Sequence, residues 1–168
     1  MKIEKKRRAE NKTNYKKRLI LLKSRIPRLV VRKTNKYLIL EIIESKHAQD
    51  CIESFVSTKE LLNYGWPKEM SGSLKSVTAG YLAGLLIGKK TKIKEVILDS
   101  GLIESTKGSR VYSVVKGISD AGIKIPYKKE ILPDENRIHG KHLKNDFSNN
   151  FNKIKDNLLQ KVAKEGKK

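Results

Sequence analysis

The 168-residue chain lacks several features of secreted and membrane-bound proteins. Its single cysteine, Cys51, excludes an internal disulfide and a cysteine-based zinc site, and we expect a small core side chain there. The longest apolar run, Tyr81 to Gly88, is far too short to cross a bilayer. Residues 1–18 contain no apolar stretch, so no secretory signal is predicted. These absences predict a soluble, cytoplasmic protein that has no membrane partner.

Acidic residues are scarce near the amino terminus. Residues 1–36 hold 15 Lys or Arg and 2 acidic residues, whereas residues 37–127 hold 12 and 10, and residues 128–168 hold 11 and 6. The net charge of +20 therefore comes mostly from a basic arm that precedes a nearly neutral body. Such arms are typical of proteins that contact nucleic-acid phosphates. A hydrophobic content of 38% is low, but it still supports a folded core.

Hydrophobic periodicity predicts an α/β body. Thr34-Asn35 suits a tight turn between two apolar strands, because Asn tolerates the left-handed region. Gly80 and Gly84 lie four residues apart on a predicted helix, which indicates a close packing partner. Gly122 is a plausible residue to follow the last body helix. The predicted elements are strands at 28–33, 37–43, about 51–56 and 95–99, and helices at 73–90 and about 109–121. This order predicts a mixed sheet with an antiparallel meander and packed helices.

Both ends of the chain carry helical patterns. Residues 13–24 place Tyr15, Leu19 and Leu22 on one stripe and lysines on the opposite one. Near the other end, an apolar stripe predicts a helix that must dock on some surface, and its members are Phe147, Phe151, Ile154, Leu158 and Val162. We therefore divide the chain into a basic arm (1–27), an α/β body (28–127) and a basic helical extension (128–168).

Several patterns resemble catalytic or metal sites without meeting their requirements. Residues 84–91 resemble a phosphate-binding loop, but Ala83 stands where the first glycine belongs, and the segment ends a helix instead of preceding one. His139 and His142 have metal-ligand spacing, but no third ligand has a fixed spacing to them. We predict no metal, no cofactor and no catalytic residue, and we expect the two histidines to contact phosphate or solvent.

Three further residues have simple structural interpretations. Asp99 and Asp120 are expected to be turn or cap residues, because a two-metal nuclease needs several converging carboxylates. Trp66 could stack on a base, but packing against the body is favoured.

The arm carries a more specific pattern. Residues 13–36 read T-x-Y-x-x-R-L-x-L-L-K-S-x-x-P-R-L-V-x-R-K-T-N-K, which resembles the signature of the ribosomal protein L eighteen family, archaeal/eukaryotic type. Further segments similar to this family follow in the right order, namely Tyr64–Trp66, Tyr81–Leu86, Leu98–Leu102, Gly108–Tyr112, Asp120–Pro126 and Pro133–His142. One departure is Tyr127, where the family usually has His.

The resemblance implies an α/β body of ribonuclease H-like topology without a catalytic site. It also implies that the protein binds 5S rRNA and helps attach it to large-subunit rRNA in the central protuberance, beside neighbouring ribosomal proteins. Beyond residue 145 nothing aligns with the family, so the tail helix rests on periodicity alone. We expect the tail to dock on a ribosomal neighbour in preference to the body, because Lys153, Lys155, Lys161 and Lys164 suggest nearby RNA.

Charge and resemblance together predict which residues bind RNA. Arginines can make bidentate phosphate contacts that lysines cannot. Tyr15 is expected either to stack on an unpaired base or to pack under the arm helix. The predicted RNA-binding residues are Lys5, Lys6, Arg7, Arg8, Lys12, Tyr15, Lys16, Arg18, Lys23, Arg25, Arg28, Arg32, Lys33, Asn35, Lys36, Arg110, Arg137, His139 and His142.

Two other functions stay open at this point. A general basic nucleic-acid-binding protein would share the same charge pattern. An RNA-processing enzyme on the same topology would need a carboxylate cluster or a nucleophile with its base, and the sequence offers neither. No small-molecule substrate is expected.

Overall fold

The computed structural model describes residues 5–10, 12–46, 49–143 and 147–165, the last four of these for their backbone only. The side chains of Val162 and Lys164, two residues of the predicted tail helix, therefore lie outside the described residues. Within the described ranges, no helix is long and apolar enough to cross a bilayer.

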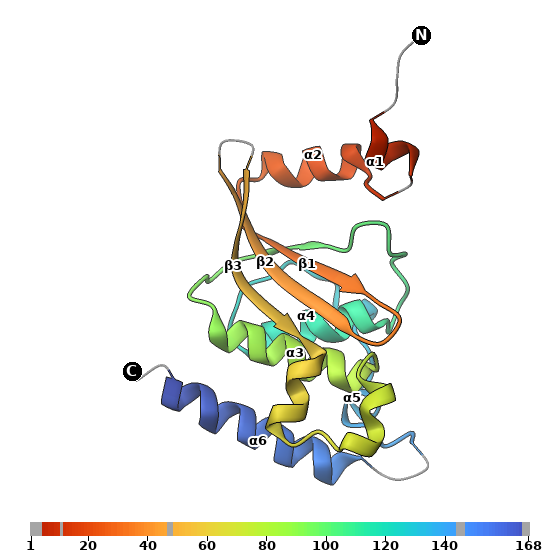
Figure 1. Ribbon diagram of the computed structural model, residues 1–168, viewed down its shortest axis with the longest axis vertical. Coiled ribbons are helices and arrows are strands. Elements are labelled where there is room, and N and C mark those ends of the chain that lie inside the picture. Colours follow the sequence, from red (N-terminus) through yellow and green to blue (C-terminus); the bar gives the residue numbers. More distant parts are fainter. Residues whose placement is uncertain (1–4, 11, 47–48, 144–146, 166–168) are drawn as a thin grey trace.

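A four-stranded sheet in the order β3-β2-β1-β4 forms the centre of the body (Figure 1). Its strands are β1 (Arg28–Lys33), β2 (Leu38–Lys46), β3 (Gln49–Ser57) and β4 (Ile97–Asp99). The first three form an antiparallel meander and β4 pairs with β1 in parallel, which confirms the predicted mixed sheet. The strand predicted at 95–99 is shorter than expected, because Glu95 instead forms an isolated bridge with Lys124.

The turn between β1 and β2 is closed by a threonine. The Thr34 amide and hydroxyl donate to the carbonyl of Tyr37 at 2.9 and 2.8 Å, and the same hydroxyl accepts from the Tyr37 amide at 2.9 Å. These bonds confirm the tight turn predicted at Thr34-Asn35, although Asn35 forms it without a left-handed backbone. Among the described residues other than glycine, Arg25 alone has a positive φ, of 57°.

Two helices of the body, α3 (Val77–Lys90) and α4 (Arg110–Asp120), pack on each other, and α3 also packs on β2 and β3. Their backbones touch through glycine, as the sequence predicted. A Cβ on Gly84 would overlap the carbonyl of Val114, and one on Gly117 would overlap the carbonyl of Tyr81. Gly122 follows α4 with a φ of 98°, and its amide donates to Ser119 at 3.0 Å, which confirms its place after the helix.

The remaining elements are short helices and the two helical ends of the chain. Short α1 (Lys6–Ala9) and α2 (Tyr15–Lys23) form the arm, and α2 confirms the helix predicted at 13–24. The others are the 3-10 helices η1 (Thr58–Tyr64), η2 (Lys68–Ser73) and η3 (Lys129–Ile131), and the helices α5 (Glu135–His139) and α6 (Ser148–Glu165). In Figure 1 the arm lies at one end of the molecule and α6 at the other.

The tail helix docks on the body, so the expected preference for a ribosomal neighbour is wrong. The described side chains of its stripe are at most 2% exposed, and these are Phe147, Phe151, Ile154 and Leu158. The Phe147 ring lies 4.9 Å from that of Trp66, and the Phe151 ring lies 5.6 Å from that of Tyr81. Periodicity correctly predicted a buried face, but the aromatic side chains that cover it come from distant parts of the chain.

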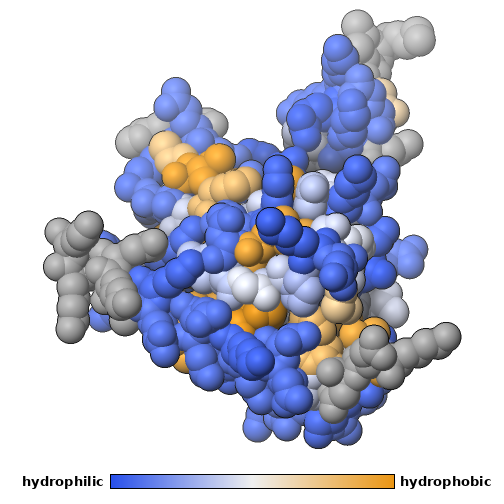
Figure 2. Space-filling view, turned by 60° about the horizontal axis from the view of Figure 1, so that its bottom comes forward, coloured by the Kyte–Doolittle hydropathy of each residue, from blue (hydrophilic) through white to orange (hydrophobic). Residues whose placement is uncertain are grey.

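Trp66 and Cys51 were both predicted to pack in the body, and the structure confirms this prediction for Trp66 alone. Trp66 is 3% exposed and its indole nitrogen donates to the carbonyl of Met70 at 3.1 Å, which confirms that it packs on the body. Cys51 is exposed, so the prediction of a core side chain is wrong. It lies in the edge strand β3, where Ile52 and Phe55 are also exposed. Figure 2 shows an apolar patch on the β2–β3 hairpin.

Candidate nucleic-acid interface

A groove of about 850 Å³ separates the arm from the body. One wall consists of residues from the arm, including Lys17, and the other of residues from β1, the loop after β4 and the start of α4. The groove brings together eight of the predicted RNA-binding residues, which are Arg7, Lys12, Arg18, Arg28, Arg32, Lys33, Arg110 and Arg137. Residues that lie up to 130 positions apart in the sequence therefore line one basic surface.

The arm is built by local contacts. The Asn14 side chain caps α2 by accepting from the Lys17 amide at 3.2 Å. Arg7 donates from Nε to the Thr13 hydroxyl at 3.0 Å and so ties α1 to the start of α2. All of the α2 side chains are described and none is buried. The helix therefore presents its cations to the groove and to solvent rather than to a core.

Tyr15 is half-buried, and the ammonium group of Lys5 lies 4.7 Å from the centre of its ring. This cation–π contact covers one face of the ring. Base stacking by Tyr15 on its other face stays a prediction.

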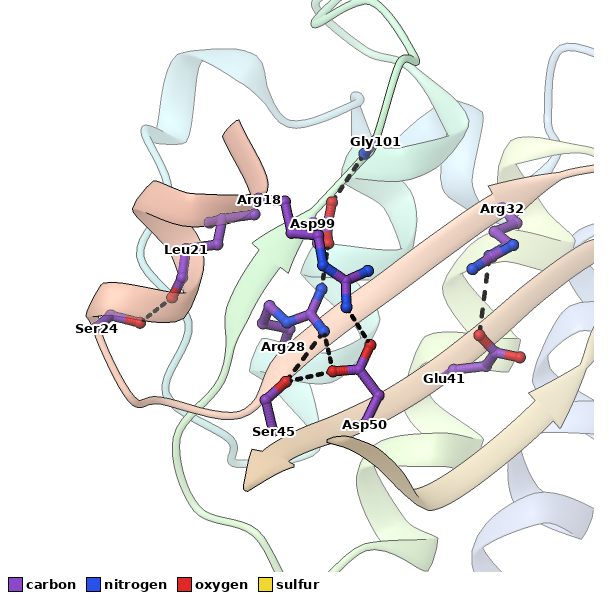
Figure 3. A network of polar contacts seen from close by, with 10 residues as sticks. All are labelled: Arg18, Leu21, Ser24, Arg28, Arg32, Glu41, Ser45, Asp50, Asp99 and Gly101. Atoms are coloured by element: carbon purple, nitrogen blue, oxygen red, sulfur yellow. Dashed lines mark hydrogen bonds and ion pairs between the residues drawn. The ribbon is translucent and has the colours of Figure 1, made fainter. Parts of the chain in front are cut away.

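Arg28 is buried and already paired with acids of the body, and its contact with RNA stays a prediction. Its side chain is 4% exposed, and its guanidinium donates to Asp99 at 2.8 Å, to Asp50 at 3.1 Å and to Ser45 at 3.3 Å (Figure 3). A buried guanidinium that already faces two carboxylates is a structural tie between β1, β3 and β4. Asp99 also accepts from the Gly101 amide at 3.0 Å, which confirms the turn role expected of it.

Arg18 and Arg32 remain accessible although each faces an acid. Arg18 donates to Asp50 at 2.7 Å while its side chain stays 40% exposed. Arg32 lies 3.8 Å from Glu41 with its side chain 60% exposed, so this pair is loose. Contacts of both arginines with RNA stay predictions, and the geometry leaves guanidinium edges free to make them.

The Asp50 carboxylate is ionised more easily than an ordinary aspartate. Its partial burial opposes ionisation, but hydrogen bonds from Ser45 and Arg18, together with the charges of Arg18 and Arg28, outweigh that effect and lower its pKa. At neutral pH this acid therefore stays charged inside a basic groove.

Other predicted residues lie outside the groove. Asn35 and Lys36 are exposed at the β1–β2 turn, and Lys16 and Lys23 are exposed on α2. The arm residues Lys5, Lys6, Arg8 and Arg25 are exposed as well. These side chains are exposed, and their contact with RNA stays a prediction.

Of the three predicted RNA-binding residues in the carboxyl-terminal extension, Arg137 alone lines the groove. Arg137, in α5, is exposed and lines the groove, and His142 is exposed nearby in sequence. The His139 ring instead stacks on Phe151 with their centres 4.7 Å apart, which gives His139 a packing role. Its contact with RNA stays a prediction.

Sequence reasoning missed four charged residues of the groove, which are Lys17, Asp50, Asp99 and Glu104. Lys17 lies within the basic motif, so the charge of the arm was a usable signal for it. Asp50 and Asp99 had no such signal, because only the folded sheet brings both of them to Arg28.

The chemistry of the groove suits phosphate recognition. Several guanidinium and ammonium groups converge there, and the positive end of the α4 dipole opens on it at Ser109 and Arg110. Among the described residues, no three His, Cys, Asp or Glu side chains gather as metal ligands. Three acids line the groove, Asp50, Asp99 and Glu104, and the first two of them are engaged by Arg28.

The chain is similar to known ribosomal proteins. The family model described as "Ribosomal large subunit proteins 60S L5, and 50S L18" matches residues 1–95 and 90–128. Large ribosomal subunit protein uL18 of Korarchaeum cryptofilum is 49% identical over 142 residues, which cover 84% of this chain and 72% of that protein. Large ribosomal subunit protein uL18 of Methanothrix thermoacetophila is 40% identical over 160 residues, which cover 91% and 92%.

Proposed function

Because this chain belongs to the family of ribosomal large-subunit proteins 60S L5 and 50S L18, we propose that it binds 5S rRNA through the groove between the arm and the body. The family makes the chain a structural component of the large ribosomal subunit in the cytoplasm, and not an enzyme. The proposal adds the identity of the RNA and a position in the central protuberance, where the protein helps attach 5S rRNA to large-subunit rRNA.

The convergence of cations on one groove is the observation that carries this proposal. The arm, residues 1–27, supplies Arg7, Lys12 and Arg18; the body, residues 28–127, supplies Arg32 and Arg110. The extension from residue 128 onward adds one further arginine to the same surface. Cations so placed neutralise closely spaced phosphates and release counterions, which provides most of the affinity for RNA.

Recognition by such a surface follows the shape of the RNA. Paired RNA hides its base edges in a deep, narrow groove, so proteins contact its backbone, its 2′-hydroxyls and its unpaired loops. A groove with a cationic arm on one side and the folded body on the other can enclose a phosphate backbone from two sides. This geometry favours a folded RNA over a straight duplex of DNA.

A competition experiment tests the proposal. The full chain is bound to labelled 5S rRNA of its own organism at moderate salt and is challenged with unlabelled 5S rRNA or with duplex DNA of equal length. The general electrostatic attraction is common to both polyanions, so a difference between them reports recognition of the shape of the RNA. We expect the RNA to compete at least tenfold better. Equal competition by DNA would identify a general basic nucleic-acid-binding protein and would overturn the proposal.

A footprint locates the contact. Hydroxyl-radical cleavage of the 5S rRNA is compared with and without the protein, and we expect protection confined to one region of the RNA. Uniform protection along the whole molecule would contradict a specific site.

A further inference from the structure

Asp50 is an acid on the wall of a groove that is otherwise rich in cations. Coulomb repulsion alone makes a carboxylate at this place unfavourable for binding a polyanion. Partial burial opposes its ionisation, but its pKa is lowered because the hydrogen bonds from Ser45 and Arg18, together with the charges of Arg18 and Arg28, outweigh that effect. The contacts of Asp50 indicate what compensates for the repulsion.

Asp50 joins the arm to the buried centre of the sheet. Its Oδ2 accepts from Arg18 on α2 at 2.7 Å, and its Oδ1 accepts from Arg28 at 3.1 Å and from the Ser45 hydroxyl at 2.5 Å. Arg28 is fixed in turn by Asp99 at 2.8 Å. Figure 3 shows this continuous chain of polar contacts from α2 through β3 and β1 to β4.

Apolar packing contributes little to the orientation of α2. Leu19 and Ile20, two of its large apolar side chains, are 56% and 69% exposed, and no side chain of the fully described α2 is buried. The connection to β1 turns at Arg25, which has a φ of 57°. A helix held this loosely on one side needs a directional contact to keep a fixed position.

We propose that Asp50 is a positioning residue that strengthens RNA binding, because it holds Arg18, and with it α2, as the arm-side wall of the groove. This inference rests on the proposed function. A docked arm has already lost the freedom that an undocked arm would lose on binding RNA. The measured affinity is proportional to the fraction of molecules whose arm is docked, so a smaller docked fraction means weaker binding. Asp50 thus aids the binding of a polyanion although it carries a negative charge itself.

Two matched variants separate positioning from charge. Asp50→Asn and Glu53→Gln each replace one carboxylate with an amide on the same strand, and each raises the net charge by one. Glu53 is exposed and does not line the groove. Charge alone predicts that both changes leave 5S rRNA affinity equal or higher. We expect Asp50→Asn to weaken binding about threefold to fivefold, and Glu53→Gln to leave it unchanged or tighter.

A mutant cycle tests whether Asp50 acts through Arg18. If the two residues form one unit, Arg18→Ala combined with Asp50→Asn weakens binding no more than Arg18→Ala alone. Additive losses, or an Asp50→Asn affinity equal to that of Glu53→Gln, would overturn the inference.

Amide hydrogen exchange of the free protein measures the arm without RNA. We expect residues 15–23 to exchange faster in Asp50→Asn and in Arg18→Ala, while α3 exchanges as in the wild type. Faster exchange in α3 of Asp50→Asn would mean that this variant loosens the body itself. In that case the exchange of α2 in Arg18→Ala tests the docking of the arm, because this variant leaves the contacts of Arg28 with Asp50 and Asp99 intact. Unchanged exchange in α2 of Arg18→Ala would overturn the inference. If the wild type fails to bind 5S rRNA while α2 responds as expected, the proposed function fails and the docking of the arm stands.

Discussion

Replacing Phe151 with alanine should lower the melting temperature of the isolated protein by roughly 6–20 °C. The Phe151 side chain is 1% exposed, and its ring lies 4.7 Å from that of His139 and 5.6 Å from that of Tyr81. Truncation of a buried Phe to Ala costs about 3–5 kcal/mol, and each kcal/mol shifts the melting temperature of a protein of this size by about 2–4 °C. Thermal unfolding followed by circular dichroism measures the change directly.

Leu159 provides the control on the same helix. It is 39% exposed, so Leu159→Ala should change the melting temperature by only about 1–2 °C. Neither change touches the groove, and 5S rRNA affinity well below the melting temperature should stay the same for both. Equal melting temperatures for Phe151→Ala and Leu159→Ala would show that α6 is not docked on the body in solution, which would refute the packing argument.

Three further changes test the arm, one groove arginine and the contact between α3 and α4. Deletion of residues 1–24 should leave a body that melts cooperatively, because α2 buries no side chain. The affinity for 5S rRNA should fall roughly tenfold or more, and full affinity after the deletion would contradict this prediction. Arg32→Ala should leave the melting temperature unchanged and make the slope of log affinity against log salt shallower by about one, whereas an unchanged slope would mean that Arg32 serves only Glu41. Gly84→Ala should destabilise the protein by about 1–3 kcal/mol in denaturant unfolding, since its Cβ would overlap backbone of α4, while Gly72→Ala, which meets no atom within 4 Å, should have almost no effect.

The order of the body elements was predictable because the periodicity of hydrophobic residues reports local structure directly. The antiparallel meander and both body helices were predicted from this signal. Gly80 and Gly84 also carried long-range information, because glycine inside a helix is unfavourable unless another backbone approaches it. The stripe from Phe147 to Leu158 correctly predicted a buried helix face.

The environment of individual side chains was less predictable, because it depends on residues far apart in the sequence. Arg28 belongs to the same basic motif as Arg18, and nothing in the motif distinguishes the two arginines. Arg28 is nevertheless buried, and it pairs with acids that lie 22 and 71 residues further along the chain. Cys51 lies in a strand, but its strand is at the sheet edge and the end of the hairpin lies beyond the core. Periodicity showed that the tail helix has a buried face, but it carried no information about which surface would cover that face.

The docked tail has a consequence for the order in which the protein folds during its synthesis. Phe147 and Phe151 cover Trp66 and Tyr81, which are made 81 and 70 residues earlier in the chain. Until α6 has left the ribosomal tunnel, the nascent body carries an uncovered aromatic surface, and such surfaces are prone to aggregation. The chain is made at about 5–20 residues per second, so this surface stays uncovered for several seconds. During that interval a transient chaperone contact on the Trp66–Tyr81 surface would protect the unfinished chain.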